Sequence, residues 1–454
     1  MKKQSGLLVG STLIFFTSLF TFLAKFGTSV IVARTLGPEG KGVYNLTLLV
    51  GSLLVLITNL GMSGSLTYLT ASRKYNVNQL FSFAVLSAVF LGGIGGLFFY
   101  FPYNTLLKYN FLAGTEKSQV ILVLIFVPGI LLTSFITSIL LGQQQIISYN
   151  IVDIIRSITN LIFQGISALL VKGVSGAILA WVASNVLAMI SALLLLKPNI
   201  NIRLLQLKSI LRSSFSFGIK NYVANLLTFF NYRLDSVLVN YYSGPTNVGL
   251  YSTGVGMAEL IWYIPNAVSG ALFPKISTLD SRTANQLTSR TCRQVLLITL
   301  VSAVGFSFIG PILIPWIYTN KFQDSVTPFL WLLPGIVGMS ISKVISADLS
   351  GRGKPQYATY TSAITVFGTV ILDIALIPTF SIIGAAIASS IAYLVSSILS
   401  VIWFSKETHT QWRQVIVPTR DDLRFIIFRG IQMATKSINR IKQQVSRVSG
   451  LDSK

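Results

Sequence analysis

The sequence predicts an all-α polytopic membrane protein, with about twelve transmembrane helices in two six-helix bundles related by a pseudo-twofold axis. Three observations predict it: an apolar composition, apolar runs long enough to cross a bilayer, and an internal repeat. Of the 454 residues, 52% are hydrophobic and 11% are charged, and the mean hydropathy is +0.70. A soluble domain carries about 25% charged residues, so this chain is expected to lie mostly in lipid.

Apolar runs of about 20 residues, the length that a membrane-crossing helix needs, fill most of the chain. The first run follows Lys2 and Lys3 and is too long for a signal peptide, so we interpret it as the first helix. The predicted spans are 8–35, 43–66, 80–101, 119–141, 151–171, 174–196, 217–241, 248–272, 294–316, 326–349, 357–378 and 383–405. They leave no room for a separate globular domain among them.

Lysine and arginine residues fall mainly in alternate loops, and this asymmetry predicts the orientation of the spans. The loops around Arg73, Arg203 and Arg352 are basic, whereas the loops around Lys108 and Lys321 carry few basic residues. Both termini are therefore predicted to be cytoplasmic, in the inner or plasma membrane of a bacterium or archaeon. The net charge of +22 is explained by these loops and the tail, so nucleic acid is not an expected partner.

The segment Gly37–Tyr44 recurs as Gly244–Tyr251, each with the pattern Gly-Pro-x-x-x-Gly-x-Tyr. A generic turn is the alternative, because Gly and Pro punctuate many loops. Six helices per half return the chain to the same side of the membrane, so the repeat is parallel. Transporters often bind substrate between such halves.

The repeat divides the chain into four predicted parts. They are a first bundle (1–197), a basic cytoplasmic linker (198–216), a second bundle (217–405) and a basic cytoplasmic tail (406–454).

Charged side chains within the predicted spans are candidates for function, because a charge at the bilayer centre costs at least ~2.5–3.5 kcal/mol. Lys25 and Thr28 share one face of the first helix, and the repeat superposes them on Tyr232 and Asp235. Glu259 belongs to a polar face of the eighth helix. The hydroxyl residues of these faces are better explained as helix–helix contacts.

The candidate site therefore combines basic and acidic residues. The candidates for substrate binding are Lys25, Arg156, Arg233 and Lys343, and the candidate coupling or cavity acids are Asp235, Glu259 and Asp373. Two of the cations also have structural explanations: Arg156 can form an ion pair with Asp153 three residues earlier, and Arg233 points away from Asp235. With Asp153 and Asp348 included, acids slightly outnumber bases in the spans.

Counting excludes several kinds of chemistry. One cysteine, Cys292, and one histidine, His409, exclude a disulfide framework and a His/Cys metal site. The sequence contains no phosphate-binding loop of the nucleotide hydrolases, so an ATPase motor within the chain is not expected. No catalytic residues, metal or cofactor are predicted, and the chain is not expected to be an enzyme.

The tail after Lys406 contains an apolar stripe from Ile427 to Val448 with basic residues on its other faces. This pattern predicts an amphipathic helix on an anionic membrane surface. A coiled-coil partner helix is the alternative, because the stripe also fits a heptad repeat. No chemistry is assigned to the tail, and we predict that it is dispensable for transport.

The segment Ala33–Tyr44 resembles the first-loop signature of polysaccharide transporters, the O-antigen or Wzx-type flippases of the MOP superfamily. Similar later motifs are Asn59–Ser63, Arg233–Asp235, Val248–Ser252 and Gly351–Lys354, so the resemblance covers about residues 7–405. It implies two MATE-like bundles around a central cavity that opens alternately to either side. It also implies a substrate of oligosaccharide on polyprenyl diphosphate, moved from the inner to the outer leaflet for polysaccharide biosynthesis.

In the family that the sequence resembles, basic cavity residues hold the diphosphate, and Lys25 best matches such a position. Membrane lipids and glycan polymerases or glycosyltransferases are then the expected partners. Two other functions stay open. A MATE-type multidrug or organic-cation exporter would use Asp235 and Glu259 to exchange protons or sodium, and a non-transporting scaffold would dock a glycan-assembly complex through the tail. Coupling of a flippase to a proton or sodium gradient is open as well.

Overall fold

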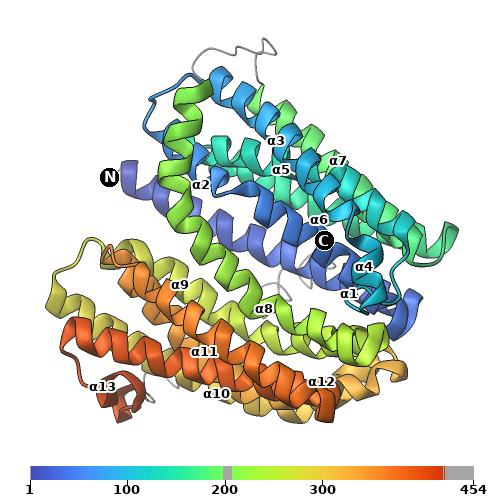
Figure 1. Ribbon diagram of the computed structural model, residues 1–454. Helices are drawn as coiled ribbons and strands as arrows, with labels where there is room; N and C mark the ends of the chain where they lie inside the picture. The colour runs from blue at the N-terminus through green and yellow to red at the C-terminus, as the bar shows by residue number, and fades with distance from the viewer. Residues whose placement is uncertain (1, 198–206, 423, 425–454) are drawn as a thin grey trace, which may run out of the picture. The chain divides into compact units, whose positions relative to one another are not determined.

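The computed structural model describes residues 2–197, 207–422 and 424, and within this part of the chain every regular element is a helix (Figure 1). Eight of the described helices are long and apolar enough to cross a membrane, which confirms the predicted fold class. The elements are α1 Lys2–Asn59, α2 Met62–Ala71, α3 Val77–Tyr100, α4 Tyr103–Lys108, α5 Lys117–Gly142, α6 Ile146–Leu170, α7 Val174–Leu196, α8 Leu207–Ala258, η1 Glu259–Trp262, α9 Tyr263–Ile276, α10 Ser281–Tyr318, η2 Asn320–Ser325, α11 Val326–Gly351, α12 Gln356–Thr408 and α13 Trp412–Ile416.

The candidate membrane helices are fewer than the twelve predicted spans, in part because α1, α8 and α12 each continue through a sharp kink between two predicted spans. The kinks lie at Gly37 (φ 70°) in α1, at Gly244 (φ 79°) in α8 and at Ser381 (φ 51°) in α12. Glycine enters this left-handed region without the steric penalty of a Cβ atom. Pro38 and Pro245 then begin the next helical leg, where their missing N–H is tolerated. Each Gly-Pro pair thus turns the chain without a loop.

Two predicted spans are interrupted, and the predictions 43–66 and 248–272 are wrong at these points. The first is broken at Leu60 and Gly61, which both have positive φ, so that α2 starts at Met62. A Cβ atom on Gly61 would lie 2.3 Å from the carbonyl oxygen of Gly218, so the close approach of α8 requires glycine here. The second span is broken by the 3-10 turn η1 between α8 and α9.

The chain forms two compact units that both draw on distant segments. Unit 1 comprises residues 1–259, 307–333 and 362–392, and unit 2 comprises residues 260–306, 334–361 and 393–454. In unit 1 the core includes the fully buried Phe135 and Leu80, and in unit 2 it includes Cys292 and Phe404. These units group segments by packing, so the predicted division into two sequence halves stays a prediction.

The predicted basic linker 198–216 is partly helical. Residues 198–206 lie outside the described residues, but α8 already begins at Leu207, ahead of the predicted start at 217. Its first turns are held within unit 1: the Ser65 hydroxyl donates to the Ser214 carbonyl oxygen (2.7 Å), and the hydroxyls of Tyr75 and Ser209 are 2.8 Å apart. These contacts explain why the helix extends beyond the apolar run that predicted it.

The first part of the predicted tail belongs to unit 2 and is packed against the rest of that unit. Glu407 forms an ion pair with Lys354, and Val415 of α13 is fully buried. The Arg293 Nε atom donates to the Asp422 carboxylate over 2.6 Å. Burial raises the pKa of Asp422, but hydrogen bonds from Arg293 and Thr419 outweigh it and hold the pKa below its ordinary value. The predicted amphipathic stripe, from Ile427 onward, lies outside the described residues.

These contacts predict that two truncations of the tail have different effects. Truncation after Phe404 removes Val415 and Asp422 and leaves Arg293 without its carboxylate, so we expect a loss of about 3–5 kcal/mol of stability. Truncation after Arg424 retains these contacts and should preserve the unfolding temperature and transport. Thermal unfolding of the purified variants in detergent compares them. Equal unfolding temperatures for both truncations would show that this docking adds no stability.

Candidate functional site

The predicted cations Lys25 and Arg156 meet in unit 1 around one carboxylate. Lys25 on α1 approaches Asp153 on α6, with 3.3 Å between its Nζ atom and Oδ2. Arg156 lies one turn along α6, with Nη1 4.0 Å from Oδ1 of the same carboxylate, so the predicted Asp153–Arg156 pair is observed. Asp153 is therefore the ion-pair partner of Lys25. Two cations share one anion, which leaves this cluster with a net positive charge.

This cluster retains capacity to bind an anion. The Lys25 side chain is 58% exposed, so its ammonium group has directions that Asp153 does not occupy. The Nε atom of Arg156 is buried and has no hydrogen-bond partner among the described residues. An ammonium carries three donors and a guanidinium five, and both suit phosphate oxygens. The exposed Lys25 ammonium can therefore meet a phosphate without first breaking the ion pairs of the cluster.

The other two predicted cations are not part of this cluster. Arg233 is an exposed residue of α8 in unit 1. Lys343 is a half-buried residue of α11 in unit 2, where its Nζ atom lies 4.4 Å from the centroid of the Trp262 ring. A cation over an indole face is a stabilising contact in itself. Lys343 therefore has a structural explanation.

Two of the predicted acids lie deep in unit 1. Asp235 on α8 is buried and accepts hydrogen bonds from the Tyr251 hydroxyl (2.5 Å) and the Ser389 hydroxyl (3.3 Å). Asp373 on α12 is fully buried, and both its carboxylate oxygens have no hydrogen-bond partner among the described residues. The two carboxyl groups are close enough to interact electrostatically. Glu259, the third predicted acid, is half-buried at the start of η1.

This pair of acids cannot keep two negative charges at low cost. Removing a carboxylate from water is expensive, and a like charge nearby adds repulsion. A proton or a small cation bound to one of these acids relieves both costs. The hydroxyls of Tyr251 and Ser389 supply further oxygens beside Asp235. The sequence singled out the acids, but it did not place these hydroxyls beside Asp235, because Tyr251 lies beyond the kink of α8 and Ser389 lies on α12.

A further acid in the predicted spans has a structural role. Asp348 is fully buried in unit 2, where its Oδ2 accepts from Arg352 Nε over 2.6 Å and its Oδ1 accepts from Thr288 over 2.6 Å. Arg352 also donates to the Asn285 side chain (2.8 Å). This carboxylate is fully paired, so it does not add to the negative charge available for a ligand.

Lys41 is a buried cation, although it lies between the predicted spans 8–35 and 43–66. Only 3% of the residue is exposed. Its Nζ atom donates to Thr253 (2.8 Å) and Ser29 (3.2 Å) and lies 4.5 Å from the centroid of the Tyr318 ring. The available signal was its position inside the repeated Gly-Pro segment. A turn carrying a lysine is usually exposed, so the pattern alone suggested a loop cation.

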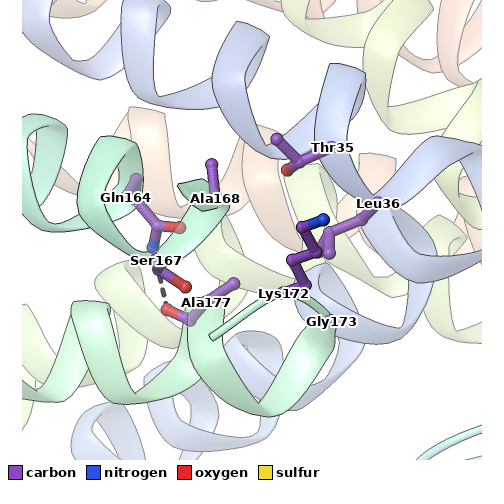
Figure 2. A pocket seen from close by; sticks show the side chains of 8 residues that line it. All are labelled: Thr35, Leu36, Gln164, Ser167, Ala168, Lys172, Gly173 and Ala177. Atoms are coloured by element: carbon purple, nitrogen blue, oxygen red, sulfur yellow. Dashed lines mark hydrogen bonds between the residues drawn. The ribbon is translucent and has the colours of Figure 1, made fainter. Parts of the chain in front are cut away.

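A cavity of about 290 Å³ lies between α1, α6 and α7 in unit 1 (Figure 2). Inside it, the Gln164 side chain donates to the Ala177 carbonyl oxygen over 2.8 Å, and Figure 2 shows Lys172 extending beside Leu36. Its lining residues are Thr35, Leu36, Gln164, Ser167, Ala168, Lys172, Gly173 and Ala177. None of the predicted site residues lines it, so it is separate from both the cation cluster and the acid pair.

The match with known families is extensive. Residues 31–327, more than half of the chain, match the family described as polysaccharide biosynthesis protein. The chain belongs to this family. Its membership confirms the resemblance that the motifs of the first loop indicated.

Two relatives of the chain are named as a probable flippase and a putative transporter. The chain is 21% identical to a probable low-salt glycan biosynthesis flippase of Haloferax volcanii, over 43% of this chain and 42% of the relative. It is 24% identical to a putative O-antigen transporter of Shigella flexneri, over 81% of this chain and 90% of the relative. The chain thus spans about two fifths of the length of the first relative and nearly all of the second.

Solved structures show the fold. The lipid II flippase MurJ aligns with a TM-score of 0.75 and 16% identity, over 95% of this chain and 93% of MurJ. An inward-facing MATE multidrug transporter of the MOP superfamily aligns with a TM-score of 0.69 and 16% identity, over 86% and 94% of the two chains. This family member therefore has the fold of MOP superfamily transporters.

Proposed function

We propose that the protein is a flippase that moves polyprenyl-diphosphate-linked oligosaccharide from the inner to the outer leaflet by alternating access. The observation that carries this proposal is the cation cluster of Lys25, Asp153 and Arg156 in a polysaccharide biosynthesis protein. An exposed cluster with a net positive charge suits a diphosphate. The names of the Haloferax and Shigella relatives support the same substrate class. Translocation needs no covalent step, so no catalytic residue is assigned.

Reconstitution tests the proposal directly. The purified protein is placed in liposomes that carry a fluorescent oligosaccharide on polyprenyl diphosphate, and an added glycosidase trims only the sugars that reach the outer surface. Protein-containing liposomes should expose the inner pool much faster than empty ones. A matched lipid with a single neutral linkage in place of the diphosphate should be flipped poorly. Equal rates with and without protein would contradict the proposal.

A MATE-type cation exporter is the second candidate, and the Asp235–Asp373 pair favours it. Buried acids are what an exporter of organic cations would use for proton or sodium exchange. In a flippase, the same pair would couple transport to the gradient, and we propose this role for it. Efflux of a fluorescent organic cation from the same liposomes distinguishes the two. Efflux without flipping would favour the exporter.

We propose that the protein resides in a bacterial or archaeal plasma membrane with both termini in the cytoplasm, as the loop charges indicate. Membrane lipids contact it throughout, and glycan polymerases or glycosyltransferases are proposed partners.

The orientation predicts which introduced cysteines react from each side in a Cys292→Ser background. Cysteines at two exposed positions, Arg73 in the turn after α2 and Arg282 at the start of α10, should react with a membrane-impermeant maleimide only after the cells are opened. Cysteines at Lys108 and Lys321 should react in intact cells, because their loops are predicted to face outward. Labelling is measured by mass shift on gels. Reaction of the first pair in intact cells would reverse the topology.

A further inference from the structure

The two repeated Gly-Pro segments contact each other reciprocally within unit 1. A Cβ atom on Gly42 would lie 1.8 Å from the Pro245 carbonyl oxygen, and a Cβ atom on Gly249 would lie 1.9 Å from the Pro38 carbonyl oxygen. Gly42 and Gly249 occupy equivalent positions of the repeat, as do Pro38 and Pro245. The contact is therefore itself pseudo-symmetric, because equivalent residues of the two segments exchange places in it. Any side chain at Gly42 or Gly249 would push the two segments apart.

A hydrogen bond also joins one further pair of equivalent residues in the repeat. The Asn45 Nδ2 atom donates to the Ser252 hydroxyl over 2.7 Å, and these two residues are also equivalent in the repeat. We call the contact formed by Pro38–Asn45 with Pro245–Ser252 the repeat junction. It joins the kinks of α1 and α8, which are predicted to lie at the outer side of the membrane.

Lys41 is buried at the repeat junction without a carboxylate. Its partners are the hydroxyls of Thr253 and Ser29, together with the ring faces of Tyr318 (4.5 Å) and Phe322 (5.5 Å). No described carboxylate lies within 4 Å of its Nζ atom. The repeat does not require this charge, since the equivalent residue of the second segment is Val248.

The neutral partners of a buried ammonium bind it less strongly than an anion would. Its hydroxyl and aromatic contacts offset the loss of water only in part, because none carries a full negative charge. A phosphate oxygen makes a charge-assisted hydrogen bond to the same ammonium, which is stronger than a bond to a hydroxyl. When a phosphate is within reach, Lys41 is therefore expected to exchange its contacts in the closed junction for the phosphate.

We propose that Lys41 is a phosphate-responsive lock of the repeat junction. With no anion present, it bridges α1, α8 and the segment around Tyr318, and the junction is closed. A diphosphate that reaches Lys41 takes over its hydrogen bonds, and the junction opens on that side. The proposal rests on the proposed function, because the anion is the diphosphate of the lipid-linked substrate. It assigns to Lys41 a role separate from that of Lys25.

Disulfide formation across the junction tests the lock without a transport assay. In a Cys292→Ser background, Asn45→Cys and Ser252→Cys are combined, and the rate of oxidative cross-linking is measured in purified protein. Farnesyl diphosphate should slow cross-linking at least severalfold, whereas farnesol, which lacks phosphate, should not. In Lys41→Met, which keeps the side-chain length and loses the charge, cross-linking should proceed and farnesyl diphosphate should no longer slow it.

A second cysteine pair controls for folding and for general effects of the ligand. Ser63→Cys and Ser134→Cys replace two hydroxyls that lie 2.9 Å apart on α2 and α5, outside the two segments of the junction. Their cross-linking should be the same with either ligand, and the same in Lys41→Met if that variant is folded. Lys41→Gln serves as a second neutral variant if Lys41→Met fails this control.

Three outcomes would overturn the lock. Farnesyl diphosphate could leave the cross-linking rate of the junction unchanged, or slow it as much in both neutral variants as in the protein that keeps Lys41. It could also slow cross-linking of the control pair as much as that of the junction pair. The flippase proposal fails separately. A diphosphate response in a protein that flips no lipid-linked oligosaccharide would overturn the function but retain the lock. Flipping without a response at the junction would overturn the lock alone.

Discussion

Replacing Lys25 by alanine is expected to lower the flipping rate about a hundredfold, with the protein still inserted at normal levels. A hydrogen bond to a charged group contributes about 1.5–3 kcal/mol, and each 1.4 kcal/mol changes a rate tenfold. Lys25 is the more exposed cation of its cluster, so it is the group that an entering diphosphate meets with least rearrangement. The liposome assay with fluorescent lipid-linked oligosaccharide measures the rate.

Charge variants separate phosphate binding from a structural ion pair. Lys25→Arg should retain part of the activity because the charge persists, and Lys25→Glu should be more damaging than alanine because it repels the substrate. Asp153→Asn removes the partner of Lys25 without removing a cation. If Lys25 binds phosphate, Asp153→Asn should keep most of the flipping rate. If Asp153→Asn and Lys25→Ala are equally impaired, the ion pair itself is what matters, and the phosphate role is wrong.

Replacing Asp373 by asparagine is expected to abolish the acceleration of transport by an ion gradient. The Asp373 carboxylate is fully buried, lacks hydrogen-bond donors among the described residues and interacts with Asp235. An asparagine has nearly the same shape but has no charge for a proton or sodium ion to neutralise. Flipping in liposomes is compared with imposed proton and sodium gradients, one at a time. The wild-type protein should respond to one of them at least tenfold, and Asp373→Asn to neither.

Glu259→Gln is the matched control for this loss. Glu259 is a predicted acid of the same protein, but it is half-buried at the start of η1, whereas Asp373 is fully buried in unit 1. It should retain the gradient response, and Asp235→Asn should lose it. A protein in which Glu259→Gln loses the response and Asp373→Asn keeps it would place the coupling group at η1.

The position of the helices was largely predictable because the signals are local. Hydrophobic runs of sufficient length specify a membrane-crossing helix by themselves, since the lipid leaves no other way to satisfy the backbone. The Gly-Pro pairs at residues 37–38 and 244–245 likewise mark kinks through their own backbone preferences. The break at Gly61 was not predictable, because the need for glycine there comes from the close approach of Gly218, far along the chain.

The sequence by itself determined that this is a helical membrane protein with a repeated kink motif and a few charges that lipid would not tolerate. The tertiary structure alone decided which groups those charges meet. In it, Lys25 forms an ion pair with Asp153, and the hydroxyls of Tyr251 and Ser389 donate to Asp235. Lys41 is buried among hydroxyls and aromatic rings. The physical reason is that the cost or use of a buried charge depends on neighbours within a few ångströms. In a helical bundle those neighbours come from other helices or from beyond a kink in the same helix, and the order of these segments in the sequence does not reveal their contacts.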